Sequence, residues 1–456
     1  MAMAPISKAT SLVFKVHRRE PELISPAKPT PRELKKLSDI DDHILVREHV
    51  HGILFYRHNH SSMINNNNSD PVQMIRKALA ETLVYYYPFA GRIREGPNGK
   101  LIVDCNGEGA MFVEADTDVA LDDFGQYLHP PFPCLEELLF DTEGPLGFLD
   151  SPLLLLQVTR LKCGGFVFAV TFCHLMCDAA SMTFFLRTLA ELTRGANAPS
   201  IPPAWDRHLL SARVPPRVTH VHHEYDDDDE HDASDTIPQV QGYFFFGPRE
   251  ISAVRRLVPA KIHVTTSELL TSHLWRCRTI ALRPLPDAET RVMIVVNARS
   301  ICSNPPLPPG YYGNVVVSPV SITTARELTE RPLEFAIRLV QAAKSSVTEE
   351  YVRSLADLLG TTGPRRLKLS DTFFVSDVRR MGWDDMDFGW GPPVYAGPPE
   401  GNTGALSLFV PCKNEDGEPG FVMSVILPEP AMTRFAEQLS GLSDKGVNNK
   451  TARSSL

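Results

Sequence analysis

Residues 166–193 read FVFAVTFCHLMCDAASMTFFLRTLAELT, an apolar run that leads through a short polar turn into a helical pattern. The apolar part, 166–172, predicts a buried strand, because a continuous apolar run of this length is typical of one. The part from 179 to 193 predicts a helix, with Gly195 as its stop signal. We therefore expect a rigid strand-to-helix junction with His174 and Asp178 in its turn.

Mixed strand and helix patterns lie on both sides of this junction. Residues 153–160 predict a partner strand, which joins 166–172 through the turn Cys163-Gly164-Gly165. Further strands are expected at 11–17, 52–57, 101–105, 110–115, 243–247, 291–298, 371–378, 406–411 and 420–427. Further helices are expected at 71–87, 249–258, 266–282, 332–348, 348–359 and 430–442. Because strands and helices alternate throughout, the predicted fold class is α/β, with two mixed α/β domains.

A Pro-rich, His-rich and acidic stretch at 196–236 is the best candidate for a linker between the domains. Within it, residues 224–235 hold eight of the chain's 55 acidic residues and no Lys or Arg. Like charges repel and do not pack, so this run predicts a solvated loop. The predicted division is an N-terminal domain at 1–205, a linker at 206–236 and a C-terminal domain at 237–456.

The composition is that of an ordinary globular protein. The chain has 456 residues, of which 43% are apolar and 22% charged, with a formal net charge of -9. These values exclude a disordered or collagen-like chain and give ample material for a core. The acidic balance argues against a nucleic-acid partner, because phosphate-backbone binders usually carry a basic patch.

Targeting signals are weak. No strongly apolar run approaches the roughly 20 residues that a membrane-spanning helix needs, and the first 11 residues hold no signal-peptide core. The eight cysteines form no CxxC pair, so reduced thiols and a cytoplasmic location are expected. The last residues, Ser454-Ser455-Leu456, loosely resemble the peroxisomal Ser-Lys-Leu signal but lack its central base.

The turn Cys173-His174-Leu175-Met176-Cys177-Asp178 is the densest group of reactive side chains. It could hold a metal through Cys173 and Cys177 with His174 and Asp178, but nothing nearby supplies a standard second ligand pair, so no metal is expected. His174 could be a buried structural histidine, with Asp178 as the cap of the following helix. His174 could also be a general base, since a neutral imidazole has a pKa near 6.5 and takes a proton from a hydroxyl.

No nucleotide-binding or serine-hydrolase motif competes with this site. The chain contains no GxxxxGK[ST], no GxGxxG and no GxSxG pattern. No serine or cysteine is evidently tied to His174 as a nucleophile. This favours direct transfer to an acceptor over a covalent enzyme intermediate.

His174 and Asp178 fit an HxxxD motif, and Asp387-Phe388-Gly389-Trp390-Gly391 follows about 210 residues later. With YPFAGR at 87–92, NARS at 297–300 and YYGN at 311–314, these residues resemble the plant BAHD acyltransferase family over most of the chain. The stretches at 12–42 and 161–170 are most similar to its benzyl alcohol O-benzoyltransferase and alcohol acyltransferase subgroup.

The resemblance implies two similar-sized α/β domains of the chloramphenicol acetyltransferase type, joined by a crossover loop. An active-site channel would run between them, with His174 at its centre, an acyl-CoA entering one mouth and an alcohol the other. His174 would deprotonate the alcohol, and a tetrahedral intermediate would expel the thiolate of CoA. Asp178 would pair with Arg299 and orient the His174 loop, and the DFGWG motif would be structural.

The resemblance also implies where the co-substrate binds. Thr265, Thr266 and Ser267 lie in the region that contacts the CoA arm in relatives, and Ser376 is a candidate donor to the oxyanion; helix capping is the alternative for these hydroxyls. The chain departs from the family where Pro392 replaces the usual lysine after DFGWG and where Ala179 replaces a glycine after HxxxD.

Three functional hypotheses remain open at this point. The first is an acyl-CoA:alcohol O-acyltransferase that moves a benzoyl or similar small acyl group, with benzoyl-CoA as the expected co-substrate. It would have no permanently bound cofactor and no membrane or nucleic-acid partner, and would act as a monomer. The second is an acyltransferase whose acceptor is a hydroxyl of an alkaloid, such as a tropane-type ring. The third is a catalytically silent relative that binds an acyl-CoA or another metabolite.

Overall fold

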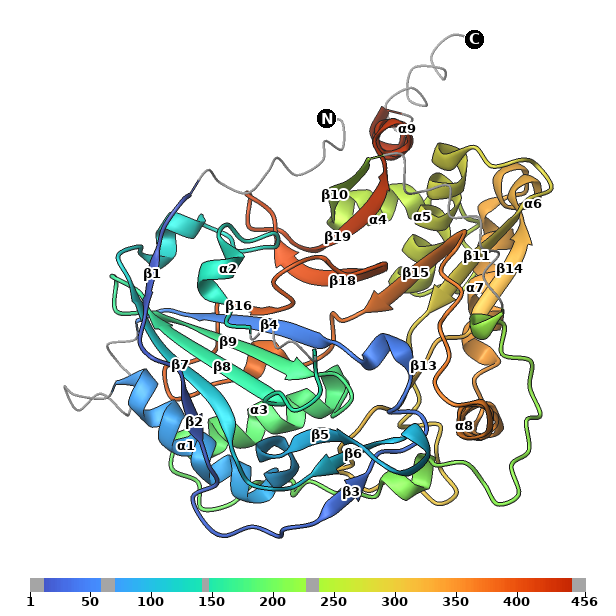
Figure 1. Ribbon diagram of the computed structural model, residues 1–456. Coiled ribbons are helices and arrows are strands. Elements are labelled where there is room, and N and C mark those ends of the chain that lie inside the picture. Colours follow the sequence, from blue (N-terminus) through green and yellow to red (C-terminus); the bar gives the residue numbers. More distant parts are fainter. Residues whose placement is uncertain (1–11, 59–69, 142–146, 227–237, 445–456) are drawn as a thin grey trace, which may run out of the picture.

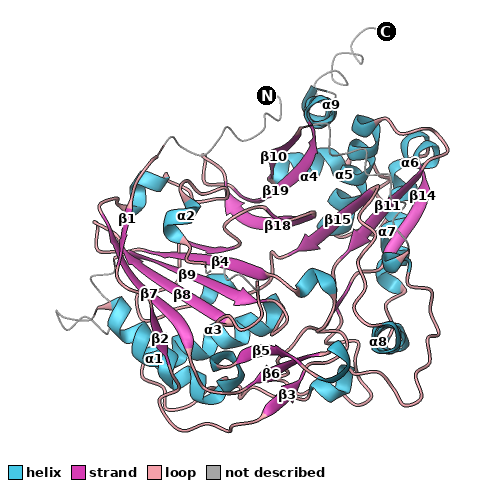
Figure 2. Ribbon diagram, viewed as in Figure 1, coloured by secondary structure: helices cyan, strands magenta, loops and turns pink. Residues whose placement is uncertain are grey.

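The computed structural model describes residues 12–58, 70–141, 147–226 and 238–444. Two large sheets dominate it, and helices cover their outer faces (Figures 1 and 2). The blue and green strands of the N-terminal half form one sheet, and mostly orange and red strands of the C-terminal half form the other. The structure thus has the mixed α/β class that the sequence predicts.

The first sheet has the order β1-β7-β8-β9-β4-β16, with β2 also paired to β7. Its strands are β1 (Val16–Arg18), β2 (Glu22–Ile24), β4 (His49–Tyr56), β7 (Ala110–Thr117), β8 (Leu154–Arg160), β9 (Phe166–Cys173) and β16 (Tyr395–Gly397). Helices α1 (Pro71–Tyr85) and α3 (Ala179–Thr193) pack together on one face of this sheet (Figure 1). The predicted hairpin of β8 and β9 and the predicted helix α3 are confirmed.

A smaller sheet and a short helix complete the N-terminal half. The sheet joins β3 (Leu34–Lys36), β6 (Leu101–Asp104) and β5 (Arg92–Glu95), and the helix is α2 (Leu135–Leu138). The strand expected at 11–17 is displaced to Val16–Arg18. The residues just before Val16 bury side chains but form no backbone ladder with a neighbouring strand. Phe14 is buried there, and the N–H of Val16 donates to the Glu137 carboxylate at 3.0 Å.

The second large sheet has the order β10-β19-β18-β15-β11-β14, with β17 paired to β18. Its strands are β10 (Gln239–Phe246), β11 (Glu289–Ile294), β14 (Val320–Thr324), β15 (Thr372–Asp377), β17 (Asn402–Thr403), β18 (Leu406–Lys413) and β19 (Pro419–Pro428). A separate two-stranded ladder joins β12 (Val296–Asn297) to β13 (Val316–Val317). The helices of this half are α4 (Pro248–Arg255), α5 (Thr266–Leu282), α6 (Ala325–Glu330), α7 (Leu333–Ser345), α8 (Glu349–Thr362) and α9 (Glu429–Asp444).

One segment of the C-terminal half crosses back to the first sheet. Strand β16 pairs with β4 in antiparallel register, with Tyr395 opposite Phe55. Just before it in the chain, the Trp383 ring packs on β4 at Gly52, where a Cβ would lie 2.4 Å from the ring. A division of the chain at the linker alone therefore does not describe residues 381–397, because this segment belongs spatially to the N-terminal half.

The described part of the linker is not a purely solvated loop, which corrects the prediction. His222 is 6% exposed, and its ring contacts the Glu224 carboxylate at 3.1 Å and the Ser354 hydroxyl at 3.0 Å. The Tyr351 hydroxyl donates to Glu224 at 2.6 Å. An argument from like-charge repulsion does not predict that Glu224 is buried. Hydrogen bonds from polar partners, including Tyr351 on helix α8, offset the cost of burying its carboxylate. The rest of the acidic run, 227–235, lies outside the described residues, as does the C-terminal tail 454–456.

The two sheets meet through a shared apolar cluster. Ile53 and Val167 of the first sheet lie in it with Val410 and Val422 of the second, and all four are buried. Burying such side chains contributes about 1.5–3 kcal/mol each, so the halves are held together by apolar contact as well as by the crossing segment. Within the described ranges, no helix has the length and apolar character needed to cross a membrane.

Candidate active site

His174 lies directly after β9, where the sheet ends and the turn to α3 begins. The His174 N–H donates to the carbonyl of Glu48, which precedes β4, at 2.9 Å. The His174 carbonyl accepts from Asn314 Nδ2 at 2.9 Å. The backbone of His174 is therefore fixed from both sides by segments far away in the sequence, while its side chain is partly exposed.

The charge state of His174 suits a proton acceptor. Burial lowers the pKa of His174 below its usual value, and the opposing influence of Asp178, Asn314 and Asp41 does not overcome it. The ring is therefore neutral near neutral pH and has one unprotonated nitrogen. His43 lies in the same region, and burial and then His174 lower the pKa of His43 to about 4. Sequence analysis did not identify His43.

Asp178 caps helix α3 and forms an ion pair with Arg299. Asp178 accepts from the Ser181 N–H at 2.9 Å, from the Val315 N–H at 3.0 Å, and from the Arg299 guanidinium at 2.7 and 2.8 Å. Burial disfavours the charged carboxylate, but Arg299 and these N–H groups outweigh burial and hold the pKa of Asp178 below its usual value. The expected Asp178–Arg299 contact and the capping contact are both present, and they use the same carboxylate.

A second buried network supports the His174 turn, and sequence analysis missed it. Asp41 accepts from the backbone and side-chain amides of Asn314 at 2.8 and 3.0 Å and pairs with Arg207 at 2.7 Å. Arg207 is 2% exposed and donates to the Met176 carbonyl at 2.6 Å. Asp41 lies in the 12–42 stretch and Asn314 in YYGN, but Arg207 falls in the predicted linker, where nothing in the local pattern marks it.

The two cysteines of the turn are unsuited to nucleophilic chemistry. Cys173 and Cys177 are fully buried. Burial raises the pKa of Cys173 to about 12 and that of Cys177 well above the usual range. The thiolate is the nucleophile and the metal ligand, so both groups are inert as placed. No cluster of three or more metal-ligating side chains occurs within the described ranges.

The DFGWG motif lies against the first sheet and forms a tight turn there. Asp387 Oδ1 accepts from the Gly389 N–H at 2.6 Å and the Gly391 N–H at 2.8 Å, and both glycines have positive φ, 110° and 87°. Phe388 is 0% exposed and packs on Tyr56 and Phe168, while Trp390 contacts Phe166. The motif is part of the N-terminal core.

The hydroxyls expected near CoA lie where α5 begins and β15 ends. Thr265 is the N-cap of α5, since Glu268 N–H donates to its hydroxyl at 3.3 Å. Despite burial, the Arg379 guanidinium and, more weakly, the Ser267 hydroxyl hold the pKa of Asp377, the last residue of β15, below its usual value. Thr266, Ser267 and Ser376 are each partly exposed. The capping alternative therefore holds for Thr265.

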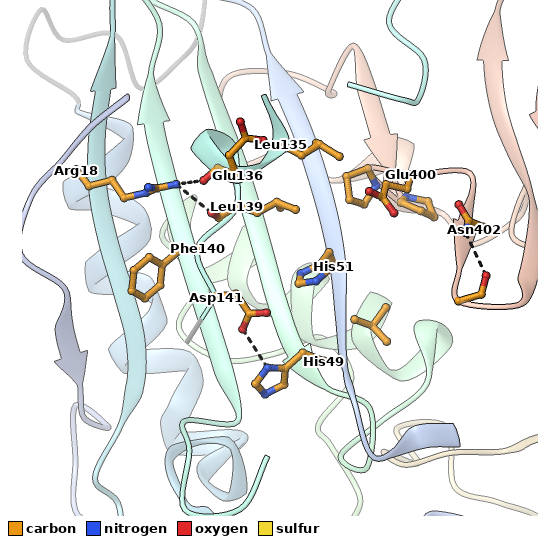
Figure 3. Close-up of a pocket in the computed structure, with 14 residues that line it drawn as sticks. Arg18, His49, His51, Leu135, Glu136, Leu139, Phe140, Asp141, Glu400 and Asn402 are labelled. Atoms are coloured by element: carbon orange, nitrogen blue, oxygen red, sulfur yellow. Dashed lines mark hydrogen bonds and ion pairs between the residues drawn. The ribbon is translucent and has the colours of Figure 1, made fainter. Parts of the chain in front are cut away.

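A cavity of about 610 Å³ opens over the first sheet, against β4 (Figure 3). Its lining combines Arg18, His49 and His51 with residues of α2 and the segment after it, and with residues in the range 398–404. His49 pairs with Cys173 across β4 and β9, and Cys173 directly precedes His174. The cavity was not identified from the sequence, because its walls come from four separate segments.

Comparisons with known proteins place the chain among acyltransferases. It matches the family described as Transferase family over residues 14–442. It is 53% identical to a protein named benzyl alcohol O-benzoyltransferase from Nicotiana tabacum, over 95% of both chains, and 53% identical to (Z)-3-hexen-1-ol acetyltransferase from Arabidopsis thaliana, over 96% of this chain and 97% of that protein. It is also 49% identical, over 100% of both chains, to 13-hydroxylupanine O-tigloyltransferase from Lupinus albus.

Solved structures with lower sequence identity show the same fold. The crystal structure of vinorine synthase superposes with a TM-score of 0.70 at 24% identity, covering 94% of this chain and 98% of that one. F. graminearum TRI101, in complex with coenzyme A and deoxynivalenol, superposes with a TM-score of 0.67 at 18% identity, covering 88% and 96%.

Proposed function

The chain belongs to the BAHD Transferase family and is an acyl-CoA-dependent O-acyltransferase of alcohols. We propose that it moves a benzoyl group from benzoyl-CoA to a small alcohol. The observation that carries the site assignment is His174, a neutral and partly exposed imidazole on a turn held by distant segments. The benzoyl donor rests on the likeness to the benzyl alcohol O-benzoyltransferase of Nicotiana tabacum.

In the proposed reaction, His174 accepts the proton of the alcohol hydroxyl. The alkoxide oxygen bonds to the thioester carbonyl carbon, whose oxygen becomes the oxyanion of a tetrahedral intermediate. The C–S bond then breaks, the ester leaves, and the proton passes from His174 to the thiolate of CoA. General base catalysis of this kind contributes about 10²–10⁴ to the rate, and holding both substrates at one site adds an entropic advantage.

We assign Asp178 and Arg299 a positioning role. Both oxygens of Asp178 are occupied by Arg299 and by backbone N–H groups, so none is left for a substrate. Their ion pair ties the start of α3 to the segment after β12. We assign the DFGWG motif a structural role, since its side chains fill the N-terminal core.

We propose that the co-substrate contacts Thr266 and Ser267 at the start of α5, with Thr265 holding that helix end, and that Ser376 donates to the oxyanion. The first N–H groups of a helix and nearby hydroxyls suit an anionic ligand such as the CoA phosphates. Ser267→Ala is expected to raise the KM for benzoyl-CoA and leave the KM for the alcohol unchanged.

The test measures thiol release from benzoyl-CoA with a panel of small alcohols, for the wild type and for His174→Ala. The variant is expected to lose at least 100-fold in kcat at an unchanged melting temperature. Equal turnover in the variant would exclude His174 as the base. If no donor and acceptor pair reacts even in the wild type, the chain is a catalytically silent metabolite-binding relative.

A second candidate acceptor is a hydroxyl of an alkaloid. The support is the 49% identity to 13-hydroxylupanine O-tigloyltransferase of Lupinus albus. A matrix of acyl-CoA donors against simple alcohols and hydroxylated alkaloids separates the two acceptors, because the favoured pair gives the highest kcat/KM.

We further propose that the enzyme works as a monomer in the cytoplasm, with one domain at each side of the 206–236 linker and the 381–397 crossing segment joining them. Light scattering at enzyme concentrations used for assays tests the monomer. A fluorescent fusion that leaves the C-terminus free tests the location and would reveal targeting by the Ser454-Ser455-Leu456 tail.

A further inference from the structure

Residues 311–315 present two successive carbonyls to two arginines. The Tyr312 carbonyl accepts from Arg207 Nε at 2.7 Å, and the Gly313 carbonyl accepts from the Arg299 guanidinium at 2.9 Å. Glycine at 313 leaves room for the first arginine, because a Cβ there would lie 2.8 Å from Arg207 Nε. Two cations from distant parts of the chain therefore bind one short segment.

The next two backbone N–H groups of this segment bind two aspartates. The Asn314 N–H donates to Asp41 at 2.8 Å, and the Val315 N–H donates to Asp178 at 3.0 Å. Each aspartate is also the ion-pair partner of one of the two arginines, at 2.7 Å in both cases. The two ion pairs thus have the same construction, and the sequence predicts only the one that contains Asp178.

The pair of Asp41 and Arg207 reaches the His174 turn at two carbonyls. Arg207 donates to the Met176 carbonyl at 2.6 Å. The side-chain amide of Asn314 donates both to Asp41 at 3.0 Å and to the His174 carbonyl at 2.9 Å. The backbone of the residue that carries the imidazole, and of the residue two positions later, is therefore tied to this ion pair.

The Arg207 side chain is fixed from several directions. It is 2% exposed, and that of Asp41 is 0% exposed. Its guanidinium stacks on the Trp205 ring at 3.9 Å from the ring centroid, and Trp205 is partly exposed. Beside Trp205, the Ala204 carbonyl accepts from the Tyr312 N–H at 3.0 Å. A planar guanidinium held in this way is pre-organised, so it fixes the turn relative to the linker.

We propose that Arg207 is a positioning residue for acyl transfer, with Asp41 as its counter-ion, so that the start of the linker sets the orientation of His174 toward the acceptor hydroxyl. This inference rests on the proposed role of His174 as the base. A misplacement of about 1 Å at a reacting group can cost 10²-fold in rate. Because Arg207 acts through the carbonyls of the turn, its loss should lower kcat and leave the KM of both substrates nearly unchanged.

Two variants loosen this contact to different extents. Arg207→Lys keeps the charge but loses the planar fork that binds two carbonyls and a carboxylate, and it is expected to lower kcat at least tenfold, with both KM values within twofold. Trp205→Ala removes the partly exposed ring that stacks on the guanidinium, and it is expected to lower kcat about threefold. The double variant should lose no more than Arg207→Lys alone, because Trp205 acts through Arg207.

The pH profile of kcat/KM is a readout that loosened packing alone would not move. The charged or titratable groups around His174 are Asp41, His43 and Asp178, with the arginines that pair with the two aspartates. Asp41→Asn leaves Arg207 as an unopposed cation, so the acid limb should move to lower pH by about half a unit. Arg207→Gln leaves the carboxylate unopposed and should move the limb in the opposite direction.

A second ion pair of the linker provides the matched control. Arg213 donates to the Asp357 carboxylate on α8 at 2.7 Å, and this carboxylate is 0% exposed, as is that of Asp41. Arg213→Lys should lower the melting temperature, as Arg207→Lys does, but leave kcat per folded molecule and the acid limb unchanged. An equal loss of kcat in both variants would show general loosening and overturn the proposal.

The proposal is also overturned if folded Arg207→Lys and Trp205→Ala react at the wild-type rate, or if neither charge variant moves the acid limb. Should Arg207→Lys not fold, Trp205→Ala decides, because its ring is partly exposed. His174→Ala, measured alongside, separates this inference from the proposed function. Unchanged turnover in His174→Ala overturns both. Its inactivity, combined with wild-type kcat in the other two variants, overturns the role of Arg207 alone.

Discussion

The HxxxD turn and the DFGWG turn are both marked by short motifs, but different forces hold them in place. The turn at 174–178 is surrounded by buried charge, with Asp178 paired to Arg299 and Asp41 paired to Arg207. The turn at 387–391 is held by aromatic packing and by two backbone hydrogen bonds to one carboxylate. The first leaves an imidazole partly exposed and the second buries Phe388 completely, so only the first can perform chemistry.

The largest expected effect is a loss of stability when the aromatic packing of the second turn is removed. Phe388→Ala removes a fully buried ring between two aromatic neighbours, and it is expected to lower the free energy of unfolding by about 3–5 kcal/mol. Urea denaturation measures the loss. The kcat per folded molecule should stay within twofold of the wild type, and Phe335→Ala, at a half-buried ring on α7, should cost less.

Asp178→Asn is expected to affect both stability and activity. It leaves the part-buried Arg299 without its counter-charge, which costs about 3 kcal/mol, and it loosens the His174 turn, so kcat falls as well. Thermal melting and thiol release are measured on the same preparation. A variant that is fully stable but inactive would instead give Asp178 a chemical role, and a double variant with Arg299→Gln should lose less than the sum of the singles.

Acid should destabilise the molecule through its buried neutral histidines. Burial lowers the pKa of His273 to about 4, whereas the unfolded chain binds this proton near pH 6.5. Stability is therefore complete above pH 6.5 and is lost as the pH falls toward 4, by about 2 kcal/mol at pH 5 from this one residue. His273→Gln should show a weaker loss between pH 7 and 5 in urea titrations, and an unchanged slope would contradict this.

The pH dependence of activity should reveal the protonation of His174, separately from the loss of stability in acid. Because its pKa lies below the usual value, kcat/KM should fall on the acid side with a midpoint below 6.5, as the ring becomes protonated. A pH–rate profile over the range in which the protein stays folded measures this. A midpoint above 6.5 would mean that another group limits the reaction.

The smallest effect is expected at Asp387. Asp387→Ala removes two half-buried hydrogen bonds from the Gly389 and Gly391 N–H groups, in a turn that aromatic packing also holds. The expected loss is about 1–2 kcal/mol, with no change in kcat. A loss as large as that of Phe388→Ala would mean that the carboxylate, and not the ring, holds this turn.

The local pattern predicted most elements because it is local. The apolar run of β9, the period of α3 and the stop at Gly195 are set by neighbouring residues, and these elements form where expected. The pair Asp178 and Arg299 was expected only through a resemblance to relatives, since its members are 121 positions apart in the chain. Glu224 was misjudged, because its partner Tyr351 lies on a distant helix.

The sequence by itself determined the class of protein, the strand-to-helix junction that carries His174, and the motif that fills the core at 387–391. Periodicity and side-chain chemistry are properties of short segments, so they can be recognised from the sequence alone. Only the tertiary structure decided that residues 381–397 cross to the first sheet, that Asp41, Arg207 and Asn314 support the His174 turn, and that four separate segments line a cavity over the first sheet. Contacts between segments far apart in the chain depend on how the sheets pack, and no local pattern encodes them.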